Sequence, residues 1–206
     1  MISIVDYGIG NIGSIINMLK WIGHASRVVS TEREVMEAEA LILPGVGAFG
    51  HGMRALSDRG LVEPIRRKAL ADKVPLLGIC LGMQLLGSHS DEGNVDGLGL
   101  MNVRFRKFEA GANRLKVPHM GWNTVEVEQD SPLFDRSSDS QEQRFYFVHS
   151  YYGVCEDRTN LVASCSYGAP FAAVIGRGNI LGCQFHPEKS HRFGASVLDK
   201  FARIKC

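Results

Sequence analysis

The sequence has 206 residues, of which 45% are hydrophobic and 22% are charged, and its formal net charge is +1. These values are ordinary for a soluble globular protein and give no reason to expect a nucleic acid or an acidic membrane surface as a partner. Asp6 interrupts the first apolar stretch, and the longest mostly apolar run, residues 74–87, is too short to cross a bilayer. We therefore expect a cytoplasmic protein without a signal peptide.

In the first half of the chain, short apolar runs alternate with helical patterns. Strands are predicted at residues 2–5, 28–29, 40–43 and 75–79. Helices are predicted at residues 15–22, in two segments around Gly60 and Pro64, and from residue 81 to 86. This alternation is typical of βαβ units and predicts a mainly parallel, doubly wound sheet with helices on both faces.

The second half of the chain contains mostly strand patterns separated by turn residues. Strands are predicted at residues 102–108, 123–128, 144–149, 161–167, 172–177 and 180–185, followed by a closing helix at 195–204. They suggest a mixed or antiparallel extension of the same sheet, and residues 110–115 and 131–143 are interpreted as surface loops. We predict one α/β domain that spans residues 1–206.

Cys80 lies between a predicted buried strand and a predicted helix, within the segment Gly78-Ile79-Cys80-Leu81-Gly82. Glycines on both sides permit the sharp turn of a nucleophile elbow, which exposes the central side chain at the edge of a sheet. A helix N-terminus lowers the pKa of a thiol from about 8.5 and offers amides that stabilise an oxyanion. The same local sequence is also compatible with a buried cysteine in a glycine-rich turn.

A second segment, Gln184-Phe185-His186-Pro187-Glu188, follows the last predicted strand. In extended backbone, residues two apart project to the same side, so His186 and Glu188 can meet. A carboxylate that accepts a hydrogen bond from one imidazole nitrogen leaves the other nitrogen to act as a base. A lone His-Pro-Glu is more often an unrelated strand end, but strand ends of one parallel sheet converge, so Cys80, His186 and Glu188 form a plausible triad.

The segment Pro44-Gly45-Val46-Gly47 also follows a predicted strand. Two glycines that bracket one residue allow a peptide plane to turn inward or to flip, as an oxyanion-binding strand requires. A plain turn explains the same residues equally well.

The remaining cysteines, Cys155, Cys165, Cys183 and Cys206, form no CxxC pair with each other or with Cys80. An odd number of cysteines without a secretion signal indicates free thiols in a reducing compartment. We interpret these four as small buried apolar residues.

Several motifs together resemble those of class I, triad-type glutamine amidotransferases. The order and spacing of Pro44-Gly45-Val46-Gly47, the Cys80 segment and His186-Pro187-Glu188 match that family. More narrowly, three further motifs are similar to those of the glutaminase subunits of imidazole glycerol phosphate synthases, and the resemblance covers essentially the whole chain. These motifs are Asp6-Tyr7-Gly8-Ile9-Gly10-Asn11, Val117-Pro118-His119-Met120-Gly121-Trp122-Asn123 and Phe145-Tyr146-Phe147-Val148-His149-Ser150-Tyr151.

The resemblance implies a flavodoxin-like fold and a glutaminase that releases ammonia in histidine biosynthesis, without a metal or organic cofactor. It also implies roles for residues outside the triad. The oxyanion side would be lined by Gly45, Val46, Gly47 and Leu81, and glutamine would be held by Gln84, Glu92, His149, Ser150 and Tyr151. A (β/α)₈-barrel synthase subunit, forming a heterodimer with this chain and receiving its ammonia, would face Asn11, Tyr146, Met120, Trp122 and Lys189. Ordinary core packing of Met120 and Trp122, and a solvated loop position for Glu92, remain alternatives.

Other functions are compatible with parts of the sequence. Gly8-Ile9-Gly10-Asn11-Ile12-Gly13 is a GxGxxG motif between a strand and a helix, with Glu32 about 20 residues on, as in dinucleotide-binding proteins. That interpretation explains neither the Cys80 elbow nor the His186–Glu188 pair. A Cys-His-Glu hydrolase without a synthase partner, a catalytically silent interaction subunit, and an amidotransferase for another acceptor, such as a surface-polysaccharide sugar, are further alternatives.

Overall fold

The computed structural model describes residues 1–109, 115–136 and 142–204. The surface loops predicted at 110–115 and 131–143 therefore lie partly outside the described residues. Cys206 lies wholly outside them. The described helices are α1 (Ile12–Trp21), α2 (Glu32–Met36), α3 (Phe49–Asp58), α4 (Val62–Leu70), α5 (Leu81–Leu85) and α6 (His191–Ala202), with 3₁₀ turns η2 (Arg158–Asn160) and η3 (Pro187–Lys189). The break between α3 and α4 falls at Gly60, as predicted, and Pro64 lies in the first turn of α4, where its missing amide hydrogen breaks no helical bond.

The strands divide into two groups along the chain. The first group is β1 (Ile2–Val5), β2 (Ser26–Val29), β3 (Leu41–Leu43), β4 (Leu76–Ile79) and, from the far end of the sequence, β13 (Ile180–Cys183). The second group is β5 (His89–Ser90), β6 (Val95–Asp96), β7 (Val103–Lys107), β8 (His119–Val127), β9 (Gln143–His149), β10 (Tyr151–Cys155), β11 (Leu161–Tyr167) and β12 (Ala169–Arg177).

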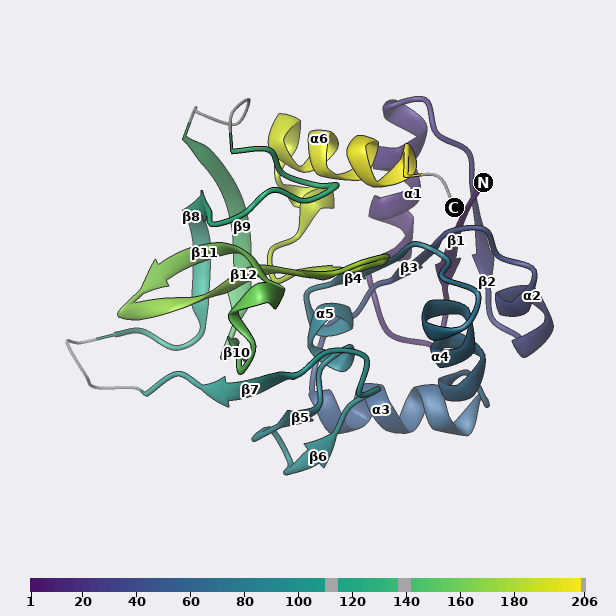
Figure 1. The fold of residues 1–206 in the computed structure, drawn as a ribbon, viewed down its shortest axis with the longest axis horizontal. Coiled ribbons are helices and arrows are strands. Elements are labelled where there is room, and N and C mark those ends of the chain that lie inside the picture. The colour runs from purple at the N-terminus through teal and green to yellow at the C-terminus, as the bar shows by residue number, and fades with distance from the viewer. Residues whose placement is uncertain (110–114, 137–141, 205–206) are drawn as a thin grey trace.

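The first group forms a parallel sheet in the order β2-β1-β3-β4-β13. Strand β12 then pairs antiparallel with β13, and the described part of the sheet continues through β10 and β7 to the short strands β5 and β6. Strands β11, β8 and β9 branch from β12 and stand at the left of Figure 1. The predicted mixed extension of a mainly parallel sheet is therefore confirmed.

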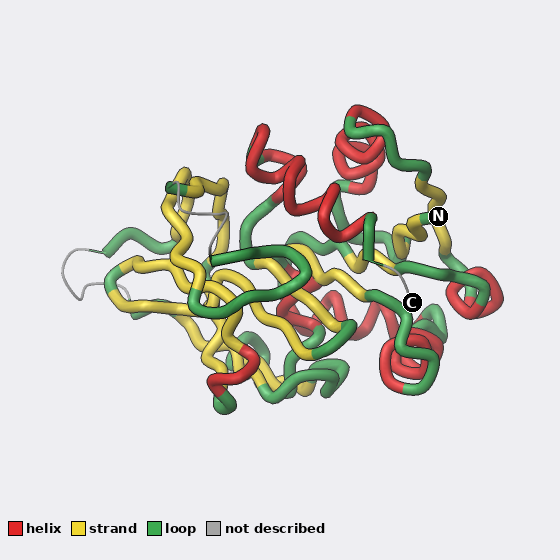
Figure 2. The backbone as a smooth tube through the Cα atoms, turned by 45° about the horizontal axis from the view of Figure 1, so that its top comes forward, coloured by secondary structure: helices red, strands yellow, loops and turns green. Residues whose placement is uncertain are grey.

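Helices cover both faces of the parallel strands (Figures 1 and 2). Helices α1 and α6 lie on one face, and α3, α4 and α5 lie on the other. The strand side chains alternate accordingly, because successive residues of a strand point to opposite faces. In β3, for example, Ile42 packs in the core under α1 and α6, whereas Leu41 and Leu43 pack in the core under α3 and α4.

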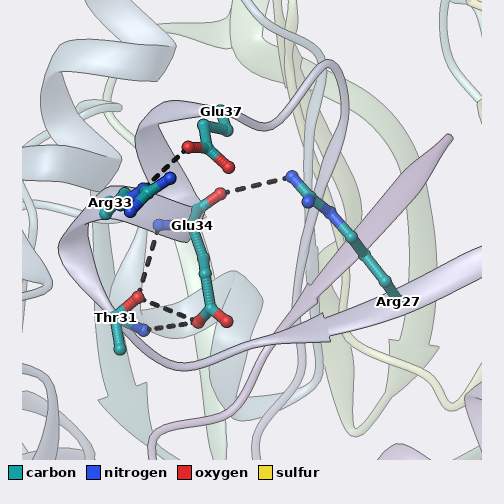
Figure 3. Close-up of polar contacts among 5 residues, drawn as sticks. All are labelled: Arg27, Thr31, Arg33, Glu34 and Glu37. Atoms are coloured by element: carbon teal, nitrogen blue, oxygen red, sulfur yellow. Dashed lines mark hydrogen bonds and ion pairs between the residues drawn. The ribbon is translucent and has the colours of Figure 1, made fainter.

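Helix α2 was not predicted, although its sequence carries a capping box. The Thr31 hydroxyl accepts a hydrogen bond from the Glu34 amide at 3.3 Å, and the Glu34 carboxylate accepts one from the Thr31 amide at 3.0 Å (Figure 3). These bonds satisfy amides that the first turn leaves unpaired. The helix has only five residues, too few for the apolar periodicity on which the prediction depended.

Some predicted boundaries are wrong in the second half of the chain. Strand β10 lies in a segment with no predicted strand, and β8 begins at His119 rather than at residue 123. Strand β13 ends at Cys183 rather than at residue 185, and α6 begins at His191 rather than at residue 195. Among residues 1–109, 115–136 and 142–204, no helix is both long and apolar enough to span a bilayer.

Candidate active site

Three loops that carry candidate site residues leave neighbouring parallel strands at the same edge. Strands β3, β4 and β13 are adjacent, with Leu43 beside Gly78 and Ile79 beside Cys183. The Cys80 amide donates to the Cys183 carbonyl at 2.8 Å, so the register continues one residue past β4. The structure thus brings together the loops that begin at Pro44, Cys80 and Gln184, as expected for strand ends in a parallel sheet.

Cys80 occupies the turn between β4 and α5 in a strained conformation, with φ 53° and ψ −112°. The flanking glycines make this turn possible. A Cβ at Gly78 would lie 2.7 Å from the backbone of Gly82, and a Cβ at Gly82 would collide with the Leu43 carbonyl. Strain of this kind persists only where the surrounding structure enforces it, and it is common at functional sites.

His186 and Glu188 form a buried pair. The distance from His186 Nδ1 to Glu188 Oε1 is 2.8 Å, and the two side chains are 2% and 1% exposed. The route to this contact differs from the prediction: Glu188 lies in the 3₁₀ turn η3, not in extended backbone, so the turn rather than strand alternation brings the two side chains together. His186 Nε2 and Glu188 Oε2 have no hydrogen-bond partner among the described residues.

The charge state of His186 is set by two opposing effects. Burial lowers its pKa, but the neighbouring Cys80 sulfur and Glu188 carboxylate outweigh burial and raise the pKa to about 10. The imidazolium is therefore the stable form beside the sulfur. The Gln184 side-chain amide also points at Cys80, with Nε2 3.8 Å from Sγ.

Cys80 and His186 line one cavity of ≈ 300 Å³. Most residues predicted to contact glutamine line it as well: Val46, Gly47, Leu81, Gln84, Glu92, His149, Ser150 and Tyr151. Gly45, also predicted on the oxyanion side, is buried and does not line the cavity. Pro118 and Val148 complete the wall and were not predicted individually, although both belong to motifs noted above.

Gln84 and Glu92 are held in place by hydrogen bonds within the chain. Gln84 Nε2 donates to Gln184 Oε1 at 3.1 Å. Glu92 Oε2 accepts from the Phe49 amide at 2.8 Å, at the first residue of α3. Glu92 is thus a half-buried carboxylate on the wall of the cavity, which favours a role at the site over a fully solvated loop position.

Two buried histidines support the far wall. His149 Nδ1 lies 2.8 Å from the Tyr151 carbonyl, so it carries the hydrogen and donates. His149 Nε2 then accepts from His119 Nδ1 at 2.9 Å. Burial lowers the pKa of His119 to about 4 and is the main cause that lowers the pKa of His149 to about 3, so both are neutral. The role of His119 was not predicted, because nothing in the sequence pairs residue 119 with residue 149.

Residues predicted to face a partner include two large exposed side chains, Met120 (67% exposed) and Trp122 (40%). Their interpretation as ordinary core residues is therefore wrong. The Trp122 ring stacks on His191 at 5.2 Å and meets the edge of Tyr146 at 6.3 Å. Lys189 Nζ lies 5.8 Å from the centre of the Tyr146 ring. Asn11 lies just before α1 and is half-buried.

The other described cysteines differ from Cys80. Cys155, Cys165 and Cys183 are free thiols, and burial raises the pKa of each. Cys165 and Cys183 are buried as predicted, whereas Cys155 is only half-buried. Among the residues that the structure describes, no group of three or more His, Cys, Asp or Glu side chains is arranged to hold a metal ion.

Two glycines of the turn after β1 have other parts of the chain packed close to them. A Cβ at Gly8 would lie 3.1 Å from the Arg59 guanidinium, and one at Gly10 would lie 3.1 Å from the Pro44 ring. Dinucleotide binding needs this space for a pyrophosphate close to the backbone. The packing therefore argues against the dinucleotide-binding alternative.

The chain is similar to known proteins both in sequence and in fold. The family model "Glutamine amidotransferase class-I" matches residues 3–204. The chain is 45% identical to imidazole glycerol phosphate synthase subunit HisH 2 of Methanococcus maripaludis, covering 98% of this chain and 99% of that one. It is 44% identical to the subunit HisH 2 of Pseudomonas aeruginosa, covering 99% and 100%. A crystal structure of a glutamine amidotransferase has the same fold, with a TM-score of 0.76 at 16% identity over 98% of this chain and 99% of that chain.

Proposed function

Because the chain belongs to the class I glutamine amidotransferase family, we propose that it hydrolyses glutamine as the glutaminase subunit of an imidazole glycerol phosphate synthase, in histidine biosynthesis. The observation that carries the proposal is the meeting of Cys80, His186 and Glu188 at the ends of two adjacent parallel strands. The 2.8 Å contact between His186 Nδ1 and Glu188 leaves Nε2 without another described partner, on the side of a cavity that Cys80 also lines.

In the proposed mechanism, the Cys80 thiolate attacks the side-chain carbonyl of glutamine. The C–S bond forms as the carbonyl electrons move to oxygen, and amides near Val46 and Leu81 bind that oxyanion. The His186 imidazolium gives its proton to the leaving nitrogen, so ammonia departs and a thioester remains. Neutral His186 then takes a proton from water, which attacks the thioester and releases glutamate. Glu188 holds the imidazole tautomer throughout.

The cavity wall supports a role in glutamine selection. We assign the α-amino and α-carboxylate end of glutamine to Gln84, Glu92 and the backbone of residues 149–151, because they line the cavity that reaches Cys80. The Glu92 carboxylate supplies negative charge for the ammonium group. The neutral His149 holds the Tyr151 carbonyl without adding charge to the site.

We also propose a (β/α)₈-barrel partner that receives the ammonia. Ammonia released into neutral water is protonated and loses its nucleophilicity, so direct transfer has a chemical advantage. The exposed side chains of Met120 and Trp122, with Tyr146 and Lys189 beside them, offer a surface with aromatic anchors of the kind found at binding hot spots. Hydrolysis is expected to be slow until this partner is bound.

The proposal is tested with Cys80→Ala in the assembled synthase. The variant should lose glutamine-dependent synthesis by at least about 10³-fold, yet keep partner binding and synthesis from added ammonium salts. Cys155→Ser, which changes a half-buried thiol outside the cavity, should leave both activities unchanged. Glutamine-dependent synthesis that survives in Cys80→Ala would refute the assigned nucleophile, and hydrolysis by the isolated wild-type chain at the full rate would refute partner dependence.

A further inference from the structure

Tyr7 is a buried side chain that the proposed mechanism does not use. It follows β1, is 1% exposed, and donates its hydroxyl hydrogen to the Pro44 carbonyl at 2.6 Å. Pro44 follows β3, which pairs directly with β1, so the bond joins two loops that leave adjacent parallel strands. A buried hydroxyl and a buried carbonyl each need a partner, and here they satisfy one another.

The Pro44–Gly45 peptide is enclosed on several sides. A Cβ at Gly45 would lie 2.7 Å from the Tyr7 hydroxyl oxygen and 2.8 Å from Leu81 Cβ. Leu81 is the residue after the nucleophile. On the other side, a Cβ at Gly10 would lie 3.1 Å from the Pro44 ring. A residue larger than glycine does not fit at position 45 without displacing its neighbours. The Pro44–Gly45 peptide therefore has little freedom to move.

The next two residues have the opposite surroundings. Val46 is 42% exposed, and Gly47 adopts φ +100° with open space, among the described residues, where its Cβ would be. Both residues line the cavity, whereas Gly45 does not. The loop therefore has one end clamped by Tyr7 and Leu81 and one end open toward the cavity.

We propose that Tyr7 is a positioning residue for glutamine hydrolysis: its hydroxyl fixes the Pro44 carbonyl, so that the Val46–Gly47 amides are presented to the oxyanion formed at Cys80. This inference rests on the proposed function. The clamp confines any rotation of the oxyanion-binding peptide to residues 46–47. Tyr7 touches neither substrate nor sulfur in this scheme and acts only through the backbone of the loop.

The test is Tyr7→Phe in the chain bound to its synthase partner, because phenylalanine keeps the ring and removes only the donor. The kcat for glutamine hydrolysis should fall by about 3–10-fold, the loss of one hydrogen bond, with the KM for glutamine within about twofold of wild type. Alkylation of Cys80 by iodoacetamide, followed by mass spectrometry of the Cys80 peptide, should keep its rate, because alkylation forms no oxyanion. A merely structural role would instead alter alkylation and kcat together.

Tyr167→Phe is the matched control. The Tyr167 hydroxyl donates to the Lys116 carbonyl, also at 2.6 Å, away from residues 44–47. This variant should leave kcat, KM and the alkylation rate unchanged. If Tyr7→Phe and Tyr167→Phe lower kcat equally, the inference is overturned, since the loss then follows from removing any tyrosine hydroxyl that bonds a backbone carbonyl.

The remaining outcomes separate this inference from the proposed function. An active wild type with an unchanged kcat in Tyr7→Phe overturns the inference alone, whereas a wild type without glutaminase activity overturns both. If Tyr7→Phe does not fold, Gly45→Ala decides, because its Cβ would press on the Tyr7 oxygen and displace the same peptide. A lower kcat with retained Cys80 alkylation supports the clamp, and an unchanged kcat overturns it.

Discussion

In the parallel part of the sheet, a buried histidine is charged, while in the antiparallel extension two equally buried histidines are neutral. His186, His119 and His149 are 1%, 3% and 6% exposed, and burial lowers the pKa of each. Of the three, His186 is the one beside Cys80 and Glu188, and these two neighbours raise its pKa to about 10. His119 and His149 bond mainly to neutral groups. At similar depth, the partners of these histidines therefore decide which of them is charged.

This difference follows from the strand arrangement. Parallel strands send successive loops to one edge, so side chains from distant segments meet there and can share charge. In the extension, β8 and β9 run antiparallel, and His119 lies directly opposite His149 in their register. Cross-strand neighbours of this kind stabilise the wall of the cavity. We interpret the parallel part as the source of the reactive groups and the extension as the source of the substrate wall and the partner-facing surface.

The largest predicted effect comes from Glu188→Gln in the parallel part. The carboxamide keeps the size of the side chain but removes the negative charge. That charge keeps the hydrogen on His186 Nδ1, which donates it to residue 188. We expect kcat for glutamine hydrolysis to fall by about 10²–10⁴-fold, measured by steady-state kinetics in the complex. Glu63→Gln, at an 85% exposed side chain on α4, is the control and should behave like wild type. A Glu188→Gln variant within about threefold of wild type would contradict the assigned role.

A smaller effect is predicted at the surface of the extension. Trp122→Ala should weaken binding of the synthase partner by about 30-fold, as expected for an aromatic hot spot, and should leave the folded chain intact. Trp21→Ala is the matched control, because Trp21 is also exposed (72%) but lies on α1, outside the proposed interface. Titration calorimetry of both variants measures the difference. Equal affinities for the partner would remove Trp122 from the interface.

The smallest effect concerns the two neutral histidines. Their folded pKa values, about 4 for His119 and about 3 for His149, lie below the ordinary 6.5. The unfolded chain therefore binds protons that the folded chain does not. This stabilisation is complete above pH 6.5 and is lost as the pH falls from 6.5 through 4 toward 3. At pH 5, each of these two histidines should lower the free energy of unfolding by about 2 kcal/mol relative to its value above pH 6.5.

Denaturant unfolding at pH 7 and pH 5 measures this loss. His119→Phe keeps a ring between Phe147 and Tyr167 and removes one of the two titrating groups, so its loss of stability between the two pH values should be about 2 kcal/mol smaller than that of wild type. All other histidines are the same in both proteins, so their titration cancels in the comparison. An identical loss in variant and wild type would show that His119 is not held neutral by the fold.

The sequence alone was enough to predict the alternating half of the fold, the mixed extension and the elbow around Cys80. These features depend on local patterns: apolar periodicity, glycines at a sharp turn and the order of motifs along the chain. The boundaries of β8 and β13 and the existence of β10 could not be predicted, because the limits of short strands depend on cross-strand packing more than on local preference.

Only the tertiary structure decided which distant groups meet and with what charge. The 3₁₀ turn η3 turns Glu188 onto His186, the β8–β9 register places His119 against His149, and the pairing of β1 with β3 brings Tyr7 to Pro44. A periodic pattern tells which face of a strand is buried, but it carries no information about the neighbour on that face. Hydrogen-bond partners and pKa values depend on that neighbour, so they are determined by the fold.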